Sequence, residues 1–392
     1  MSLVLGLMLA LAPADDAAQD LQKFLVDDAQ NIRYLRMDNI DEKERKHYLA
    51  VVSFVLNSIS NKKKITRPVL VNETLIRFDI RDYGIDAKAY EDIGTDPYTK
   101  QNKVLKKLTN SENPLIRIDW FIMKSTVAPT YYKLLGVTDL KSFQSRHDYD
   151  TKTAKKLKLE QAAIVVLGGL NRNTRYLKRT SLISGYIWEA RDSASIDYLG
   201  DLLTNQYDSV QLLASNSNGL ISYFAADKKG KAMDMLDADV AMDHSKSFEP
   251  DLVVRVVRNC FACHSVGVVP IEDAVRGMLN KDIKLISPNK DFTDRISELF
   301  GSKLPIKEDQ ELYVKAVLKA TGMESKALTH KFVHIWKSYY ADLTLEQAAR
   351  EVGKTKDEFK KWCEETKDAH LVHLVVVGKI HRVHFEKALG GK

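Results

Sequence analysis

Residues 258–265 read R-N-C-F-A-C-H-S, and this short stretch constrains the chain more than any other. Cys260 and Cys263 are separated by two residues, and His264 follows the second cysteine directly. Residues three apart on a helix share a face, so both thiols are expected to project from one turn beside the imidazole. The fold must therefore bring two sulfur atoms and one ring nitrogen to a single small site.

The spacing Cys-x-x-Cys-His is typical of covalent haem attachment. Two thiols one helical turn apart can each add to one vinyl group of a rigid porphyrin, and the adjacent imidazole can then ligate the iron. We therefore expect one haem c, held by Cys260, Cys263 and His264 as the proximal ligand. Three alternatives stay open, namely a thioredoxin-like redox pair, a zinc site with a fourth ligand, and a disulfide across a short loop.

The segment before the motif predicts a helix that begins at Ser247 or Glu249, because Pro250 suits a first helical position. Three apolar side chains of this helix are expected to line one face of the haem: Val253, Val256 and Val257. Two basic side chains could neutralise the haem propionates, with solvated helix positions as the alternative: Arg255 and Arg258.

The sixth iron ligand decides between an electron carrier and a catalyst, because an open position admits peroxide or a gas. Met323 lies at a suitable distance downstream, and Met278 lies closer behind the motif. His330 and His334 are four residues apart, so they share a helix face and could ligate the iron or another metal. Packing and solvation are the simpler interpretation of all these side chains.

The C-terminal part contains further metal-ligating residue types. Cys363 has no partner if the other two cysteines carry haem, so a buried inert thiol is expected there. Four histidines follow in an imperfect amphipathic pattern, and a metal site among them is the less favoured interpretation: His370, His373, His381 and His384.

The predicted fold class is α+β, with a mixed N-terminal domain that contains β-hairpins and a mainly helical, cytochrome-c-like C-terminal part. A helical pattern runs from Asn31 to about Leu56, and apolar and polar residues alternate from Leu75 to Ile80. A second extended segment follows Pro114, and a helix resumes near Pro129. Asn218-Gly219 supplies the turn of the clearest hairpin.

The N-terminal sequence has an apolar run from Leu3 to Leu11 and small residues at Ala10–Ala12, which predict a signal peptide over residues 1–14. No Lys or Arg precedes this run, so a buried helix is the alternative. We divide the remaining chain into an α+β domain of unknown role, a haem domain and a helical segment, over residues 15–244, 245–328 and 329–392. No later segment is long enough to span a bilayer, so a mature chain without an integral membrane segment is expected in the periplasm or outside the cell.

Several short segments, taken in order, resemble exported bacterial proteins with a single haem-c motif, a mostly uncharacterised family of planctomycetes and myxobacteria. They are I-R-Y-L at Ile32, R-P-V at Arg67, I-R-F-D-I-R-D-Y-G ending at Gly84, I-D-W-F at Ile118, G-L-N-R-N-T-R at Gly169, Trp188, N-G-L-I-S-Y at Asn218, Val269-Pro270 and A-D-L-T-L-E-Q-A-A-R-E-V-G at Ala341. The resemblance implies a c-type cytochrome without a settled substrate. Where that family has Q-H-D-G-G-E, this chain has Q-Y-D-S-V-Q, so Tyr207 replaces a histidine and becomes another candidate for the sixth ligand.

The leading hypothesis is electron transfer to or from a redox partner protein. The alternative is a haem-dependent oxidoreductase of the peroxidase type, although the sequence shows no distal acid–base pair. A remote alternative is nucleic-acid binding, because L-T-L-E-Q-A-A-R-E-V-G-K-T-K-D-E-F-K-K-W also fits a helix-turn-helix with Gly353 in its turn. The net charge of +6 comes from 59 basic and 53 acidic residues that are interspersed, so it does not indicate a nucleic-acid partner.

Overall fold

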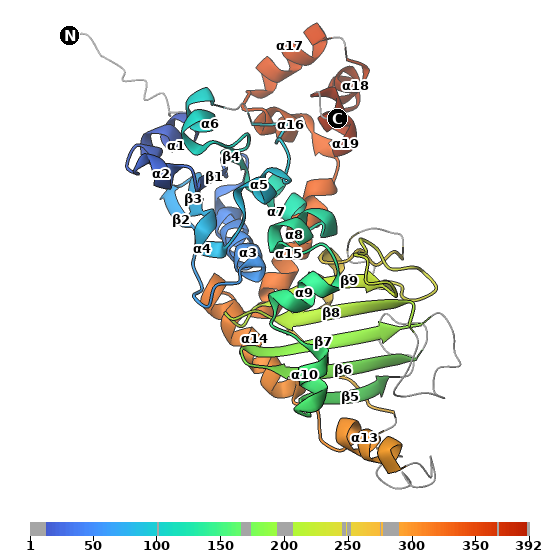
Figure 1. Cartoon of the computed structure of the whole chain (residues 1–392). Helices are drawn as coiled ribbons and strands as arrows, with labels where there is room; N and C mark the ends of the chain where they lie inside the picture. The colour runs from blue at the N-terminus through green and yellow to red at the C-terminus, as the bar shows by residue number, and fades with distance from the viewer. Residues whose placement is uncertain are drawn as a thin grey trace, which may run out of the picture.

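The computed structural model describes residues 13–99, 102–165, 174–193, 207–244, 248, 252–274, 276, 290–366 and 368–389. Helices and two main β-sheets share the chain, so the predicted α+β class is confirmed. The N-terminal and C-terminal helices gather at one end of the molecule and a five-stranded sheet forms the other, as Figure 1 shows. The long helices α3 (Glu42–Ile59), α14 (Ile306–Thr321) and α15 (Ser325–Tyr340) pack together between these two ends.

The first sheet has four strands in the order β2-β3-β1-β4. Strand β1 (Ile32–Arg36) is antiparallel to β3 (Leu75–Asp79) and parallel to β4 (Leu115–Arg117), while β2 (Val69–Asn72) forms an edge. All five residues of β1 are buried, because helices cover both faces of the sheet.

The second sheet is an antiparallel meander in which each strand pairs with the next along the chain. Its strands are β5 (Glu160–Val165), β6 (Arg175–Leu182), β7 (Gly185–Asp192), β8 (Ser209–Ser215) and β9 (Ile221–Asp227). Figure 1 shows α9 and α10 on one face of this sheet and α14 on the other. The Cys-x-x-Cys-His motif approaches the face that α14 also covers.

The remaining elements are short and connect or flank the two sheets. Before the second sheet these are α1 (Pro13–Leu21), α2 (Val26–Ala29), α4 (Ile80–Tyr83), α5 (Ala87–Glu91), α6 (Lys103–Thr109), α7 (Ile118–Ser125), α8 (Ala128–Leu135), α9 (Leu140–Arg146) and α10 (Thr151–Lys156). After it come α11 (Arg258–Cys263), α13 (Lys290–Phe300), β10 (Leu343–Thr344), α16 (Leu345–Glu351), α17 (Lys356–Thr366), α18 (Ala369–Val377), β11 (Lys379–Ile380) and α19 (Arg382–Ala388).

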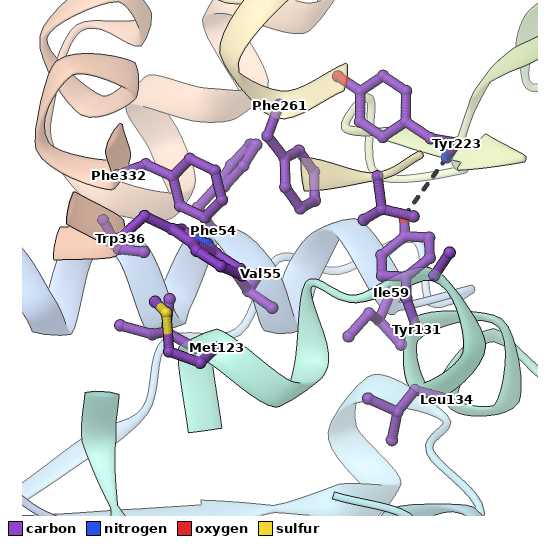
Figure 2. Packing of buried hydrophobic residues seen from close by; sticks show 14 of the residues in the cluster. Phe54, Val55, Ile59, Met123, Tyr131, Leu134, Tyr223, Phe261, Phe332 and Trp336 are labelled. Carbon is purple, nitrogen blue, oxygen red and sulfur yellow. Dashed lines mark hydrogen bonds between the residues drawn. The ribbon is translucent and has the colours of Figure 1, made fainter. Parts of the chain in front are cut away.

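The central core joins the motif helix α11 to the long helices. Phe261, between the two motif cysteines, packs its ring 5.1 Å from that of Phe54 on α3 and 5.5 Å from that of Phe332 on α15. Figure 2 shows these rings meeting beside Trp336, with Tyr131 of α8 on the far side. The buried Phe261 therefore fixes α11 in the interior while the cysteines and His264 face elsewhere.

Several local predictions are confirmed. The alternation from Leu75 to Ile80 is β3, the helix near Pro129 is α8, and the hairpin is β8–β9. Gly219 in its turn has a φ of +86°, a conformation that glycine adopts readily. The extended segment after Pro114 is shorter than predicted, because α7 begins at Ile118.

The predicted helix from Asn31 to about Leu56 is wrong in its first part. Residues up to Arg36 form strand β1, and α3 begins only at Glu42. Both arginines of this strand are buried. Arg33 donates to two backbone carbonyls and Arg36 pairs with the carboxylate of Asp38, so both guanidinium groups have hydrogen-bond partners inside the fold.

The predicted signal peptide lies mostly outside the described residues. The first element among the described residues is α1. None of the helices among the described residues is long and apolar enough to cross a membrane. One large hydrophobic cluster contains residues from 35 to 385, and so draws on all three predicted segments of the mature chain. The predicted boundary at residue 328 falls within α15, and the division into domains stays a prediction.

Candidate functional site

The motif helix α11 begins later than the sequence predicted. Residues 252–257 are not helical, and Arg258 is the first helical residue. Val257 has a φ of 72°, which is unusual for a β-branched residue and marks a sharp change in chain direction. The run of β-branched valines before it favours extended backbone, and Val257 forms a bridge to Val127 instead of a helical turn.

Asn259 fixes the start of α11. Its side-chain oxygen accepts a hydrogen bond from the backbone N–H of Arg255 at 2.9 Å, and its amide donates to Asp243 at 2.6 Å. Asn259 is 2% exposed and Asp243 is 3% exposed, so this contact lies inside the protein. The arrangement sets the orientation of the next residue, Cys260.

Cys260, Cys263 and His264 all line one cavity of about 580 Å³. Binding sites for small molecules and cofactors have volumes of about 300–1,000 Å³, so the cavity is large enough for a cofactor. Most of its wall is apolar and comes from the second sheet and the segment after the motif. The described wall includes Leu177, Trp188, Ala190, Leu213, Tyr223, Val268, Val269, Pro270 and Ile271.

The strand register explains why the sheet side of the cavity is continuous. Leu177 of β6 lies opposite Ala190 of β7, which in turn lies opposite Gln211 of β8. Side chains directly opposite on neighbouring strands project from the same face. A second such row is formed by Trp188, Leu213 and Tyr223, so two adjacent rows make up the wall.

His264 carries its imidazole proton on a defined nitrogen. Its Nδ1 lies 2.9 Å from the carbonyl oxygen of Gly267, so Nδ1 is the donor and Nε2 keeps the lone pair. Burial lowers the pKa of His264, which favours the neutral ring. A histidine that ligates a metal typically donates its other N–H to a carbonyl or carboxylate in this way.

Gly267 makes the turn that brings its carbonyl back to His264. It has a φ of +84°, and a Cβ atom at this position would lie 3.1 Å from the ring of Tyr313 on α14. Both the backbone conformation and the close ring favour glycine here. Val269 and Pro270, part of the family resemblance, follow this turn and line the cavity.

The two motif thiols are held in their protonated form. Burial raises the pKa of Cys260 to about 12 and that of Cys263 to about 11. Redox-active Cys-x-x-Cys pairs and zinc sites instead use thiolates, which require a lowered pKa. Both cysteines are half-buried on the cavity wall, and burial favours their neutral thiols over the thiolates that either alternative requires.

A polar corner of the cavity was missed by the sequence analysis. Arg175 lines the cavity and binds Asp192 through two hydrogen bonds, from Nε at 2.5 Å and from Nη2 at 2.9 Å. Gln211 also lines the cavity and donates to Asp192 at 2.7 Å. The positive charge of Arg175 contributes to the lowered pKa of His264. Arg175 is the last residue of G-L-N-R-N-T-R, a segment that the sequence analysis noted without assigning it a role.

The two arginines proposed beside the motif do not line the cavity. Arg258 is 5% exposed and lies over the rings of Phe248 and Trp336, at 4.8 and 4.5 Å. Arg255 forms a bridge with Met235 in a segment that runs ahead of α11. Of the three valines expected to face the haem, Val256 lines the cavity and Val257 is buried elsewhere.

Four of the five candidates for the sixth iron ligand belong to the described residues, and none of these four lines the cavity. Met323 follows α14, where its backbone N–H donates to Thr321. His330 and His334 share an exposed face of α15, as their spacing predicted, and Tyr207 lies under Arg191 with 5.2 Å between guanidinium and ring centre. Met278 lies outside the described residues.

The remaining sequence candidates lie in the C-terminal helices. Cys363 is fully buried on α17, and burial raises the pKa of its thiol to about 11, so an inert thiol fits its position. The predicted helix pair exists as α16 and α17, with Gly353 between them at a φ of +67°. Within the described residues, no three His, Cys, Asp or Glu side chains converge as they would around a bound metal ion.

No known protein family, no curated protein and no solved structure matches this chain. The motif and the cavity that it lines are therefore the features of the molecule that indicate a function.

Proposed function

We propose that the chain is an exported c-type cytochrome, with one haem bound covalently through Cys260 and Cys263 and ligated by His264. One observation carries the proposal: all three motif side chains line a single apolar cavity of about 580 Å³. A bound haem supplies one-electron chemistry at its iron. The signal peptide predicted from the sequence supports the same assignment, because thioether haem is normally assembled outside the cytoplasm, and a periplasmic or secreted location is part of the proposal.

The chain's own residues prepare the site in three ways. The carbonyl of Gly267 orients His264 and makes its free nitrogen a better ligand, as outer-shell hydrogen bonds do at metal sites. The sheet wall excludes water through Leu177, Trp188 and Leu213. Arg175 supplies a cation that can pair with a carboxylate such as a haem propionate, while Asp192 fixes its orientation.

Electron transfer to a redox partner protein is the first assignment, and a peroxidase-type oxidoreductase is the second. The polar groups of Arg175 and Gln211 favour the second, because they lie together on the cavity wall and could contact a small polar substrate. Absorption spectra separate the two. Low-spin, six-coordinate iron in both redox states supports the carrier, whereas a high-spin form that binds added ligand supports the enzyme.

The attachment is tested by mass. We expect the chain, purified from a host with haem-maturation enzymes and then denatured, to retain one haem and to give a c-type pyridine haemochrome spectrum. The variant Cys260→Ala/Cys263→Ala should lose all covalent haem, because both thioether positions are gone.

Cys363→Ala is the matched control, since it removes a buried cysteine that lies outside the cavity. It should retain the same haem mass as the unaltered chain. A bare polypeptide mass for the unaltered chain, or equal haem content in the Cys260→Ala/Cys263→Ala variant, would contradict the proposal.

A further inference from the structure

A second hollow lies at the C-terminal end of the chain, far from the motif in sequence. Its volume is about 550 Å³, and all four C-terminal histidines line it. His370 and His373 lie on α18, three residues apart, while His381 precedes α19 and His384 lies three residues further. Residues three apart share a helix face, so each pair presents its imidazoles to one side.

The backbone brings one histidine of each pair, His370 and His384, ring to ring. Gly378, with a φ of +81°, ends α18 and turns the chain toward α19. Strand β11 between the helices pairs with β10, which ties the turn to the rest of the fold. Leu371, Leu374 and Phe385 are buried, whereas His373, His381 and His384 are exposed, so these three imidazoles lie on the solvent side of the chain around the hollow.

The distances between the imidazoles suit one shared ion. The ring centres of His370 and His384 are 4.7 Å apart, and those of His381 and His384 are 6.2 Å apart. With metal–nitrogen bonds of about 2.1 Å and a tetrahedral angle, two imidazoles on one ion have ring centres about 5 Å apart. The two observed separations lie on either side of this value, and His384 is common to both.

We propose that this hollow binds one divalent transition-metal ion of the zinc type through His370, His381 and His384. His373, Asp342 or a water molecule completes the coordination, since both side chains also line the hollow. Imidazole ligands suit zinc, copper and nickel, whereas magnesium and calcium favour oxygen ligands. This proposal is independent of the haem assignment, because no motif residue lines the hollow.

Binding requires the rings to rotate. In the described part of the chain, no three His, Cys, Asp or Glu side chains already converge on one point. His381 and His384 are exposed, and exposed side chains change rotamer within nanoseconds, so rotation is a small barrier. The 18° angle between the rings of His370 and His384 shows a parallel stack, which an ion would replace with two coordinate bonds.

The test is calorimetric titration of the full-length protein with zinc sulfate. We expect saturable binding of one ion per chain, and at least tenfold weaker binding for His384→Asn, because His384 belongs to both imidazole pairs. Thermal melting checks that this exposed substitution leaves the fold intact. Substituting Co²⁺ for zinc should give the intense visible bands of tetrahedral coordination in the unaltered chain and weaker bands in His384→Asn.

Two control variants locate the ion. His330→Asn/His334→Asn removes another exposed histidine pair, and Cys260→Ala/Cys263→Ala removes the motif thiols, so both should bind zinc as the unaltered chain does. Equal binding by His384→Asn and the unaltered chain would overturn the proposal. Absence of saturable binding, or loss of binding only in a control variant, would overturn it as well.

Discussion

The two hollows of this molecule have similar volumes, about 580 and 550 Å³, but opposite surroundings. The motif cavity is lined by one imidazole, two protonated thiols and an apolar sheet wall, whereas the C-terminal hollow is lined by four imidazoles, three of which are exposed. A large planar cofactor requires apolar surface, and a hydrated cation requires lone pairs that solvent can reach. The burial of the ligating side chains therefore indicates the type of ligand better than their number does.

This contrast predicts that a substitution in the core behind the motif cavity lowers the free energy of unfolding, whereas a substitution beside the C-terminal hollow does not. Phe261→Ala should lower the free energy of unfolding by about 3–5 kcal/mol, because it removes a buried ring that packs against Phe54 and Phe332. Val377→Ala, at a position 58% exposed beside the second hollow, should change it by less than about 0.5 kcal/mol. Urea denaturation measures both values.

Haem content distinguishes a structural role of Phe261 from a chemical one. If the chain holds haem as proposed, attachment requires only the cysteines and the histidine, so Phe261→Ala should retain covalent haem at full stoichiometry despite its lower stability. Similar stabilities for the two variants would show that α11 is not anchored through this ring, and would remove the contrast between the hollows.

A buried imidazole behind the second sheet predicts how the core responds to acid. His147 is 7% exposed, its Nε2 lies 2.9 Å from the hydroxyl of Ser222, and burial lowers its pKa to about 3. An unfolded histidine has a pKa of about 6.5, so between these two values only the unfolded chain binds the proton. The free energy of unfolding should therefore fall as the pH falls below about 6.5, and this contribution amounts to about 2 kcal/mol at pH 5.

The variant His147→Gln tests this contribution, because its amide can still bond Ser222 but does not titrate. Its free energy of unfolding should fall less between pH 7 and pH 5 than that of the unaltered chain. His334→Gln, at an exposed position on α15, controls for the exchange of histidine for glutamine. An equal loss of stability in all three proteins would show that proton binding by His147 does not cause the loss.

Local chemistry explains which parts of the fold could be predicted from the sequence. Asn218-Gly219 determines a tight turn almost alone, and the hairpin was placed correctly. Strand β1 was missed because its arginines are buried against residues far along the chain: Arg33 lies over the ring of Tyr90, and Arg36 donates to the carbonyl of Tyr98. The start of α11 was misplaced because the conformation of Val257 depends on a bridge to Val127, far away in the chain.

The same distinction applies to the candidate sites. Cys260, Cys263 and His264 are adjacent in sequence, so their clustering could be predicted, although the function that it supports remains a proposal. The cavity wall could not be predicted, since it depends on the register of β6, β7 and β8. Arg175 was overlooked because its partner Asp192 is 17 residues away in the sequence, and only the pairing of β6 with β7 brings the two side chains together.

Substitution of Arg175, in the polar corner of the cavity, is expected to have the smallest and most specific effect. If the chain holds haem as proposed, Arg175→Gln should lower the midpoint potential of the iron by tens of millivolts, because losing a nearby positive charge favours the ferric state. Arg175→Lys keeps the charge and should shift the potential less. Spectroelectrochemical titration of the haem-loaded protein measures both shifts.

A substitution of Asp192 separates the effect of charge on the midpoint potential from the effect of geometry. Arg175→Gln leaves its carboxylate uncompensated, which adds to the expected fall in potential, whereas Arg175→Gln/Asp192→Asn removes both charges together. The double variant should therefore return toward the potential of the unaltered chain. If the midpoint potential of the double variant falls further instead, Arg175 and Asp192 act by holding the strands β6 and β7 in register. The charge of Arg175 then does not determine the potential of the iron.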